Sequence, residues 1–204
     1  EEETRLTNNY VLDGHPDWSP DGSKIVFASF RDAHGNPSGT ADIYTVNLDG
    51  TELTQLTNSS WEDYDPAWSP DSTQIAYVTN KYGAEEIMVA PVGGCSRFAK
   101  VCPTRITINK YRDLHPAWSP NGRTIAFSSQ RAKDPSLQIY TMTPTGGSVR
   151  KLTSDKAAST QPSWAPSGRS IAFISRRGVD RTPSVYTMTS TGSSQRRITS
   201  GSTN

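Results

Sequence analysis

The chain has 204 residues, of which 33% are hydrophobic, and its 21 Lys and Arg residues almost balance its 20 Asp and Glu residues. This length is sufficient for a sizeable core, and the sequence has no apolar run long enough for a membrane-spanning helix. The charge is unevenly placed: residues 1–100 carry 6 basic and 16 acidic residues, a net −10, and residues 101–204 carry 15 and 4, a net +11. Such an asymmetry bears on partners: it favours contact between acidic and basic surfaces, either between the two halves of one molecule or between copies.

Two markers repeat along the chain. Trp-Ser-Pro occurs at residues 18–20, 68–70 and 118–120, and Trp-Ala-Pro follows at 164–166, so the spacing is 50, 50 and 46 residues. A Leu-Thr or Ile-Thr pair keeps almost the same spacing, beginning at Leu6, Leu56, Ile106, Leu152 and Ile198. A period of 40–50 residues is typical of solenoids, propellers and repeat arrays.

Each repeat predicts four short strands, and no segment shows a sustained helical period. The first strand ends at the tryptophan, at 15–18, 65–68, 115–118 and 161–164. After a Ser-Pro-Asp-Gly type of turn, the second strand lies at 25–27, 75–77, 125–127 and 171–173. The third lies at 43–46, 87–90, 139–142 and 185–188, and a Gly-bearing turn leads to a fourth strand with the Leu-Thr pair.

Four short antiparallel strands and one large aromatic residue per repeat predict an all-β fold, a β-propeller of four four-stranded blades. We expect one domain over 1–204, with repeats at about 8–57, 58–107, 108–153 and 154–199 and an extra outer strand at 3–9. Because five outer strands exceed four blades, we expect the chain to belong to a larger propeller or to self-assemble; the alternative is a closed monomer in which the N-terminal strand completes the last blade. The core tryptophans should be buried between blades rather than stack on a ligand: Trp18, Trp68, Trp118 and Trp164.

The segment from His15 to Gly22, followed by Ile25–Phe27, Asp42–Tyr44 and Leu56-Thr57, resembles the TolB-like repeat, a relative of the WD-type blade. The resemblance covers about residues 4–199. It implies a propeller in a periplasmic or secreted protein. It leaves the function open, because the family includes non-catalytic scaffolds, propellers of peptidases and some polysaccharide lyases.

Two cysteines, Cys95 and Cys102, lie in the turn between the third and fourth strands of repeat two. Cysteines across a hairpin can meet, so we expect a disulfide and an extracellular or periplasmic location. Two free thiols in a cytosolic protein are the alternative. The spacing matches no zinc motif.

Three pairs of polar residues at the starts of the first strands are the candidate site. Strand alternation places residues i and i+2 on one face, so these side chains would line the central channel: Asp13, His15, Asp63, Asp65, Asp113 and His115. There they could hold calcium or another divalent cation, with Asp13, Asp63 and Asp113 as metal ligands, or an anionic sugar. The alternative is that the aspartates bond backbone amides and tie blades together.

No catalytic residues are predicted, because nucleophile, zinc-protease and phosphate-loop motifs are absent. The basic second half lacks an RNA-binding motif, which excludes a nucleic-acid partner from the prediction. We therefore expect a non-catalytic extracellular or periplasmic scaffold that binds a protein or associates head-to-tail with itself and needs no cofactor. The alternative is an accessory propeller, or a fragment, of a polysaccharide lyase or peptidase that binds an anionic ligand such as a polysaccharide in the channel.

Overall fold

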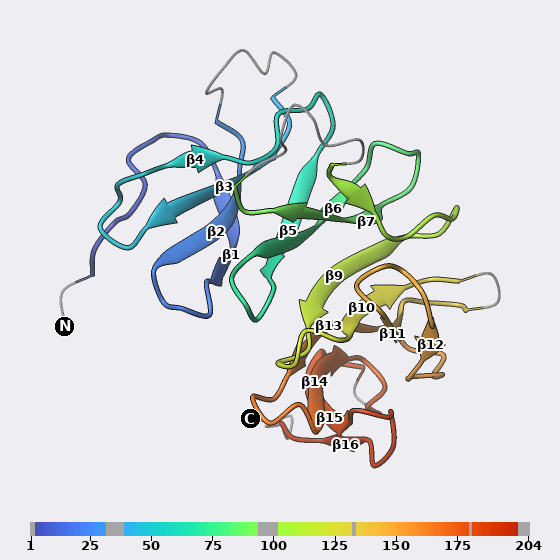
Figure 1. Ribbon diagram of the computed structural model, residues 1–204. Coiled ribbons are helices and arrows are strands. Elements are labelled where there is room, and N and C mark those ends of the chain that lie inside the picture. Colours follow the sequence, from blue (N-terminus) through green and yellow to red (C-terminus); the bar gives the residue numbers. More distant parts are fainter. Residues whose placement is uncertain (1–2, 32–38, 94–101, 132–133, 180, 200–204) are drawn as a thin grey trace.

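Sixteen short strands form four separate sheets along the chain. The computed structural model describes residues 3–31, 39–93, 102–131, 134–179 and 181–199, and these residues form strands and turns without a helix. Each sheet has four antiparallel strands in chain order and makes one blade: blade 1 is β1–β4, blade 2 is β5–β8, blade 3 is β9–β12 and blade 4 is β13–β16. The prediction of an all-β propeller with four four-stranded blades is confirmed (Figure 1).

The strands recur at equivalent positions in the four blades. The first strands end at the tryptophan: β1 (Asp13–Trp18), β5 (Asp63–Trp68), β9 (Asp113–Trp118) and β13 (Ser159–Trp164). The second strands are β2 (Lys24–Ser29), β6 (Gln74–Thr79), β10 (Ile125–Ser129) and β14 (Ser170–Ser175). The third strands are β3 (Asp42–Asn47), β7 (Glu86–Pro91), β11 (Gln138–Met142) and β15 (Ser184–Thr189). The outer strands are short: β4 (Thr54–Gln55), β8 (Thr104–Arg105), β12 (Arg150–Lys151) and β16 (Arg196–Arg197).

The turn between the first two strands of a blade is built by its own sequence. In blade 1 the amide of Gly22 donates to the Ser19 carbonyl at 2.8 Å, and Gly22 has a φ of 72°, which glycine adopts without strain. The Ser19 hydroxyl accepts a hydrogen bond from the Lys24 amide at 2.9 Å. These bonds all lie within residues 19–24, so the turn needs no contact with another blade.

The core lies between neighbouring blades, because each sheet is apolar on both faces. Between blades 1 and 2, Val26 and Ile43 of blade 1 pack against Trp68 and Tyr77 of blade 2. Equivalent clusters join blade 2 to blade 3 and blade 3 to blade 4, and Trp118 and Trp164 pack against them. Each of these three tryptophans therefore packs onto the blade that precedes it.

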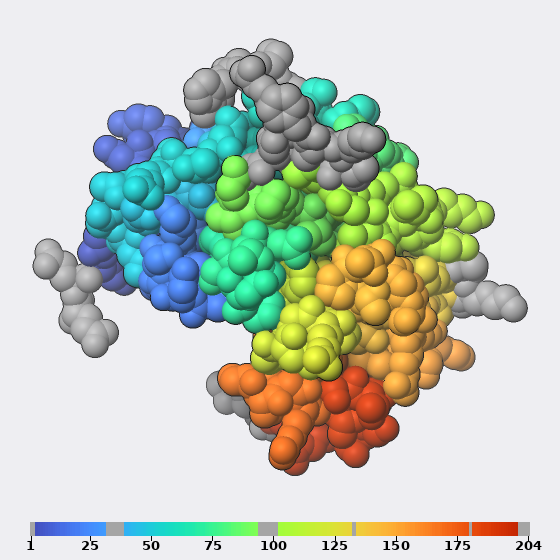
Figure 2. All heavy atoms as spheres, viewed as in Figure 1, coloured from blue at the N-terminus to red at the C-terminus, as the bar shows by residue number. Residues whose placement is uncertain are grey.

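The four blades form an open row rather than a closed ring. Among the described strands, those of blade 1 contact only blade 2, and those of blade 4 contact only blade 3. The first blade (blue) and the fourth (orange to red) lie apart in Figure 2. Trp18 therefore has no preceding blade, and it is 59% exposed, whereas Trp68 is 5% exposed. The prediction that Trp18 is buried is wrong for this reason.

The extra outer strand predicted at 3–9 is not formed, and the first strand begins at Asp13. The backbone of this segment nevertheless lies against blade 1: a Cβ atom on Gly50 would be 3.0 Å from the Leu6 carbonyl oxygen. The same close approach recurs in blades 3 and 4, at the pairs Gly146–Ile106 and Gly192–Leu152. Ile106 of blade 2 lies against blade 3 in this way, and Leu152 of blade 3 lies against blade 4. Leu6 lies against blade 1 in the same way, although no blade precedes blade 1 in the structure.

No helix capable of crossing a lipid bilayer occurs among the residues that the structure describes. Cys95 lies outside these residues, so the Cys95–Cys102 disulfide stays a prediction.

Candidate functional site

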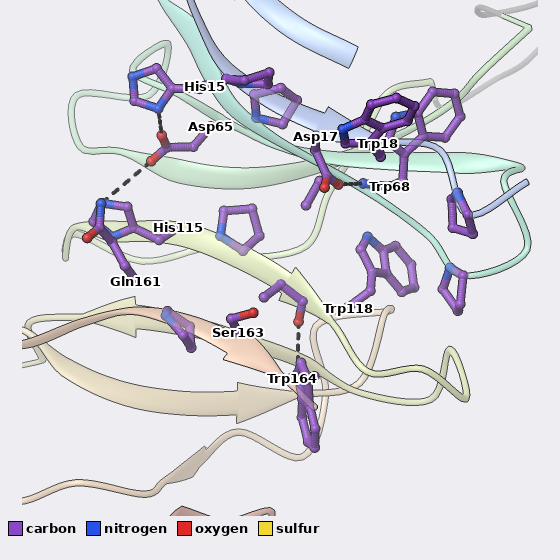
Figure 3. Close-up of a pocket in the computed structure, with 18 of the residues that line it drawn as sticks. His15, Asp17, Trp18, Asp65, Trp68, His115, Trp118, Gln161, Ser163 and Trp164 are labelled. Carbon is purple, nitrogen blue, oxygen red and sulfur yellow. Dashed lines mark hydrogen bonds and ion pairs between the residues drawn. The ribbon is translucent and has the colours of Figure 1, made fainter. Parts of the chain in front are cut away.

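The first strands of all four blades converge on one pocket of about 510 Å³ in the middle of the row. Four side chains, one from each blade, occupy equivalent places in it (Figure 3): His15, Asp65, His115 and Gln161. Each of them precedes a proline of its strand. These prolines and the four tryptophans also line the pocket. This pocket is the central channel that the repeat pattern predicts.

A backbone irregularity turns these four side chains toward the channel. Each has a positive φ, 53° at His15, 49° at Asp65, 52° at His115 and 53° at Gln161, which non-glycine residues seldom adopt. The strand pairing shifts register at the same place, for example between Gly14 and Asp17 in blade 1. A bulge of this kind re-aims a side chain and interrupts the alternation of the strand.

The interrupted alternation corrects the predicted site. His15, Asp65 and His115 line the channel, but Asp13, Asp63 and Asp113 do not. Residues i and i+2 share a face only in a regular strand, and the bulge places the second residue of each pair apart from the first.

The three displaced aspartates bond neighbouring polar groups instead. Both Asp13 carboxylate oxygens accept from Arg31 at 3.1 Å. Asp113 accepts from the Asn109 amide at 2.7 Å. None of the three carboxylates lines the channel, so the metal site at Asp13, Asp63 and Asp113 stays a prediction without support from this arrangement. Among the described residues, no group of three or more His, Cys, Asp or Glu side chains is arranged to hold a metal ion.

In the channel, the carboxylate of Asp65 lies between the imidazole rings of His15 and His115. One Asp65 oxygen contacts His15 Nδ1, and the other lies 3.7 Å from His115 Nε2. These contacts join the first strands of blades 1, 2 and 3 (Figure 3). Burial lowers the pKa of His115 below its usual value, and the Asp65 carboxylate opposes this effect.

Two further residues of the channel were missed by the sequence analysis. Asp17 accepts a hydrogen bond from the Trp68 amide at 2.8 Å and so ties blade 1 to blade 2. Burial raises the pKa of Asp17, although this bond works in the opposite direction. Gln161 holds in blade 4 the place of the His or Asp of the other blades, so a search for titratable residues alone does not find it. The signal that identifies it is its place before Pro162, which it shares with His15 before Pro16.

The family comparison agrees with the repeat pattern. Residues 2–102 and 102–204 both match the family model described as the TolB beta propeller domain. No curated protein matches the chain.

Solved structures share the fold at low sequence identity. A protein described as TolB from Agrobacterium tumefaciens has a TM-score of 0.77 and 23% identity over 96% of this chain. An oligogalacturonate lyase from Vibrio parahaemolyticus has a TM-score of 0.66 and 17% identity over 96% of the chain. A puromycin-hydrolysing peptidase from Mycobacterium tuberculosis has a TM-score of 0.70 and 15% identity over 95%. The chain spans 65%, 55% and 29% of the lengths of these three proteins. At such identities the likeness shows the fold alone.

Proposed function

Because this chain belongs to the TolB beta propeller domain family, we propose that it is a non-catalytic scaffold that binds protein through the open ends of its row of blades. The observation that carries this proposal is the exposure of Trp18. The equivalent Trp68 is 5% exposed against blade 1, whereas Trp18 is 59% exposed. A large exposed aromatic residue on a face that is otherwise built for sheet packing is typical of a protein interface.

The opposite end of the row supports the same proposal. On the outer face of blade 4, Val185 is 37% exposed and Ile198 is 52% exposed. Their counterparts in blade 3, Ile139 and Leu152, are 0% and 8% exposed because blade 4 covers them. Both ends therefore present side chains of the kind that the inner blades bury against one another.

The partner that fits best is a second copy of the chain, bound head-to-tail. Blade 1, at one end of the row, belongs to the half of the sequence with net charge −10, and blade 4, at the other end, belongs to the half with net charge +11. Contact between unlike ends would repeat the packing of consecutive blades, and opposite charges would favour this orientation. A head-to-tail contact that does not close produces open assemblies. Further blades of a longer propeller to which these residues belong are the alternative.

The mass in solution tests this proposal. Sedimentation at rising protein concentration should show association that weakens as salt is raised, since salt screens charge attraction beyond about 8 Å at physiological ionic strength. Replacing Trp18 with Ser should weaken association at least about tenfold, because buried tryptophans contribute about 2 kcal/mol or more at interfaces. The matched control is Trp61→Ser, since Trp61 is 45% exposed in a connecting loop. A chain that stays monomeric at every concentration would contradict self-association. Equal loss in both variants would contradict the role of Trp18.

The compartment we propose is the periplasm or the exterior of the cell. The family resemblance supports it, and so does the predicted Cys95–Cys102 disulfide, because disulfides persist in oxidising compartments.

An anionic ligand in the channel, such as an acidic polysaccharide, is the less favoured function. Such a ligand needs cationic groups, and the described residues that line the channel include neither Lys nor Arg. Its two histidines both face Asp65. We therefore place protein binding first.

A further inference from the structure

In three of the four blades an arginine covers a pair of aromatic rings. It lies two residues after the second strand, and its guanidinium carbon lies 5.0–5.7 Å from the centroids of both rings. The three groups are Arg31 over Phe27 and Tyr44, Arg131 over Phe127 and Tyr140, and Arg177 over Phe173 and Tyr186. Attraction between a cation and the ring faces stabilises this arrangement.

The same guanidinium reaches the residue that begins the first strand of its blade. Arg31 bonds both oxygens of Asp13 at 3.1 Å, Arg131 lies 3.7 Å from Asp113, and Arg177 donates to Ser159 at 3.0 Å. The side chains of these three arginines are only 13%, 26% and 16% exposed. In each of these blades the cation is therefore inserted between a polar group and an aromatic pair.

Blade 2 keeps the acceptor but lacks the arginine. Asp63 begins β5 and is 3% exposed, and Tyr77 is also 3% exposed. The residue two positions after β6 is Lys81, which is exposed, with its ammonium 5.7 Å from the Tyr82 ring centroid. Among the described residues, no cationic side chain forms an ion pair with Asp63, and hydroxyl groups surround its carboxylate, including that of Ser59 at 3.4 Å.

A pocket of about 380 Å³ lies at this place in blade 2. It is lined by Asp63, Tyr77 and Thr79 together with Lys81, Tyr82 and Met88. Asp63, Tyr77 and Thr79 occupy the positions of Asp13, Phe27 and Ser29 around Arg31, and Met88 replaces the second aromatic ring. Tyr82 has no aromatic counterpart in the other blades, and the Arg105 guanidinium carbon lies 4.1 Å from its ring centroid. The pocket thus joins a buried carboxylate, a hydroxyl group and an aromatic wall.

We propose that this pocket of blade 2 binds a guanidinium group supplied from outside the blade, either by a small molecule or by an arginine side chain of a peptide. The planar guanidinium fork matches a carboxylate and stacks on an aromatic face, which an ammonium group does less well. Burial raises the pKa of Asp63 to about 6, although hydroxyl groups oppose the shift. The carboxylate is thus ionised at neutral pH and lacks a described cation to offset its burial.

Titration of the whole chain with N-acetyl-arginine methylamide tests the proposal by calorimetry or by NMR shifts of blade 2. The neutral citrulline analogue is the matched probe, and we expect it to bind at least about tenfold more weakly, since charged hydrogen bonds contribute about 1.5–3 kcal/mol. Equal binding of both probes would overturn the proposal. A blocked peptide with one central arginine distinguishes the two sources: tighter binding than the amino-acid probe indicates a protein source, and equal binding indicates a small molecule.

Variants locate the site. Asp63→Asn should abolish binding, whereas Glu62→Gln, which changes the exposed neighbouring acid, should leave it unchanged. Lys81→Arg should weaken binding at least about tenfold because the tethered guanidinium competes for the carboxylate, and Lys81→Ala should retain it. Binding that survives both Asp63→Asn and Lys81→Arg would place the ligand elsewhere and overturn the proposal. Arg97 and Lys100 lie outside the described residues. Binding that appears only after both are changed to Ala would show that the chain fills its own pocket, and would also overturn the proposal.

Discussion

The charge of Asp63 should destabilise the folded protein, and replacing Asp63 with Asn should therefore stabilise it at neutral pH. Asp63 is 3% exposed, and the hydroxyl groups around it favour the carboxylate but offset only part of the effect of burial. Burial raises its pKa from 3.8 to about 6, and the neighbouring Asp42 charge adds to the shift. Asparagine has the shape of the protonated acid and carries no charge, so the substitution isolates the cost of ionisation.

The size and sign of the effect follow from the difference in pKa between the folded and unfolded chains. The unfolded chain releases this proton near pH 4 and the folded chain near pH 6. Between these values the folded state binds more protons than the unfolded state, so the free energy of unfolding falls as pH rises. The stability associated with protonated Asp63 is therefore fully present below pH 4 and is lost as pH rises through 6. A shift of about 2 units corresponds to about 3 kcal/mol at 1.36 kcal/mol per unit.

Urea unfolding followed by tryptophan fluorescence at several pH values between 4 and 8 measures this difference. We expect the stability of Asp63→Asn relative to wild type to increase by up to about 3 kcal/mol from pH 4 to pH 7. Other carboxylates titrate in this range, and Glu62→Gln controls for them because Glu62 is exposed. If wild type and Asp63→Asn change in parallel across this range, burial does not penalise the Asp63 charge and the reasoning is refuted.

Two further predictions concern the blade interfaces and the cysteines. Replacing Trp68 with Ala should lower the free energy of unfolding in denaturant by about 3–5 kcal/mol, because it leaves a large cavity between blades 1 and 2. Trp18→Ala should lower it by less than about 1 kcal/mol in the monomer, because Trp18 is 59% exposed. Equal losses would contradict the open row. Titration with a thiol reagent should find no free thiol in unreduced protein, and reduction of the Cys95–Cys102 disulfide should cost about 2–3 kcal/mol, since the closed loop is short. Two titratable thiols in native protein would contradict the disulfide.

The sequence was sufficient to predict what depends on local geometry and on repetition. Turns with glycine at positive φ, such as that at Gly22, and second strands rich in β-branched and aromatic residues determine a four-stranded blade from neighbouring residues alone. Because the pattern recurs four times, the prediction of four blades needed no long-range information. Even the surplus outer-strand marker at Leu6 could be counted in the sequence.

Only the tertiary structure decided which copies of each residue are buried and where their side chains point. Trp18 and Trp68 have the same local sequence, but burial requires a preceding blade, which only Trp68 has. The channel lining depends on a bulge at His15 and its equivalents. A prediction from alternating side chains assumes a regular strand, so it cannot locate the bulge. The pocket at Asp63 likewise depends on tertiary packing, because strands β5, β6 and β7 each supply part of its lining and the Lys81 ammonium lies near the Tyr82 ring. Local sequence determines the blade, and the neighbours of each blade determine what its side chains can do.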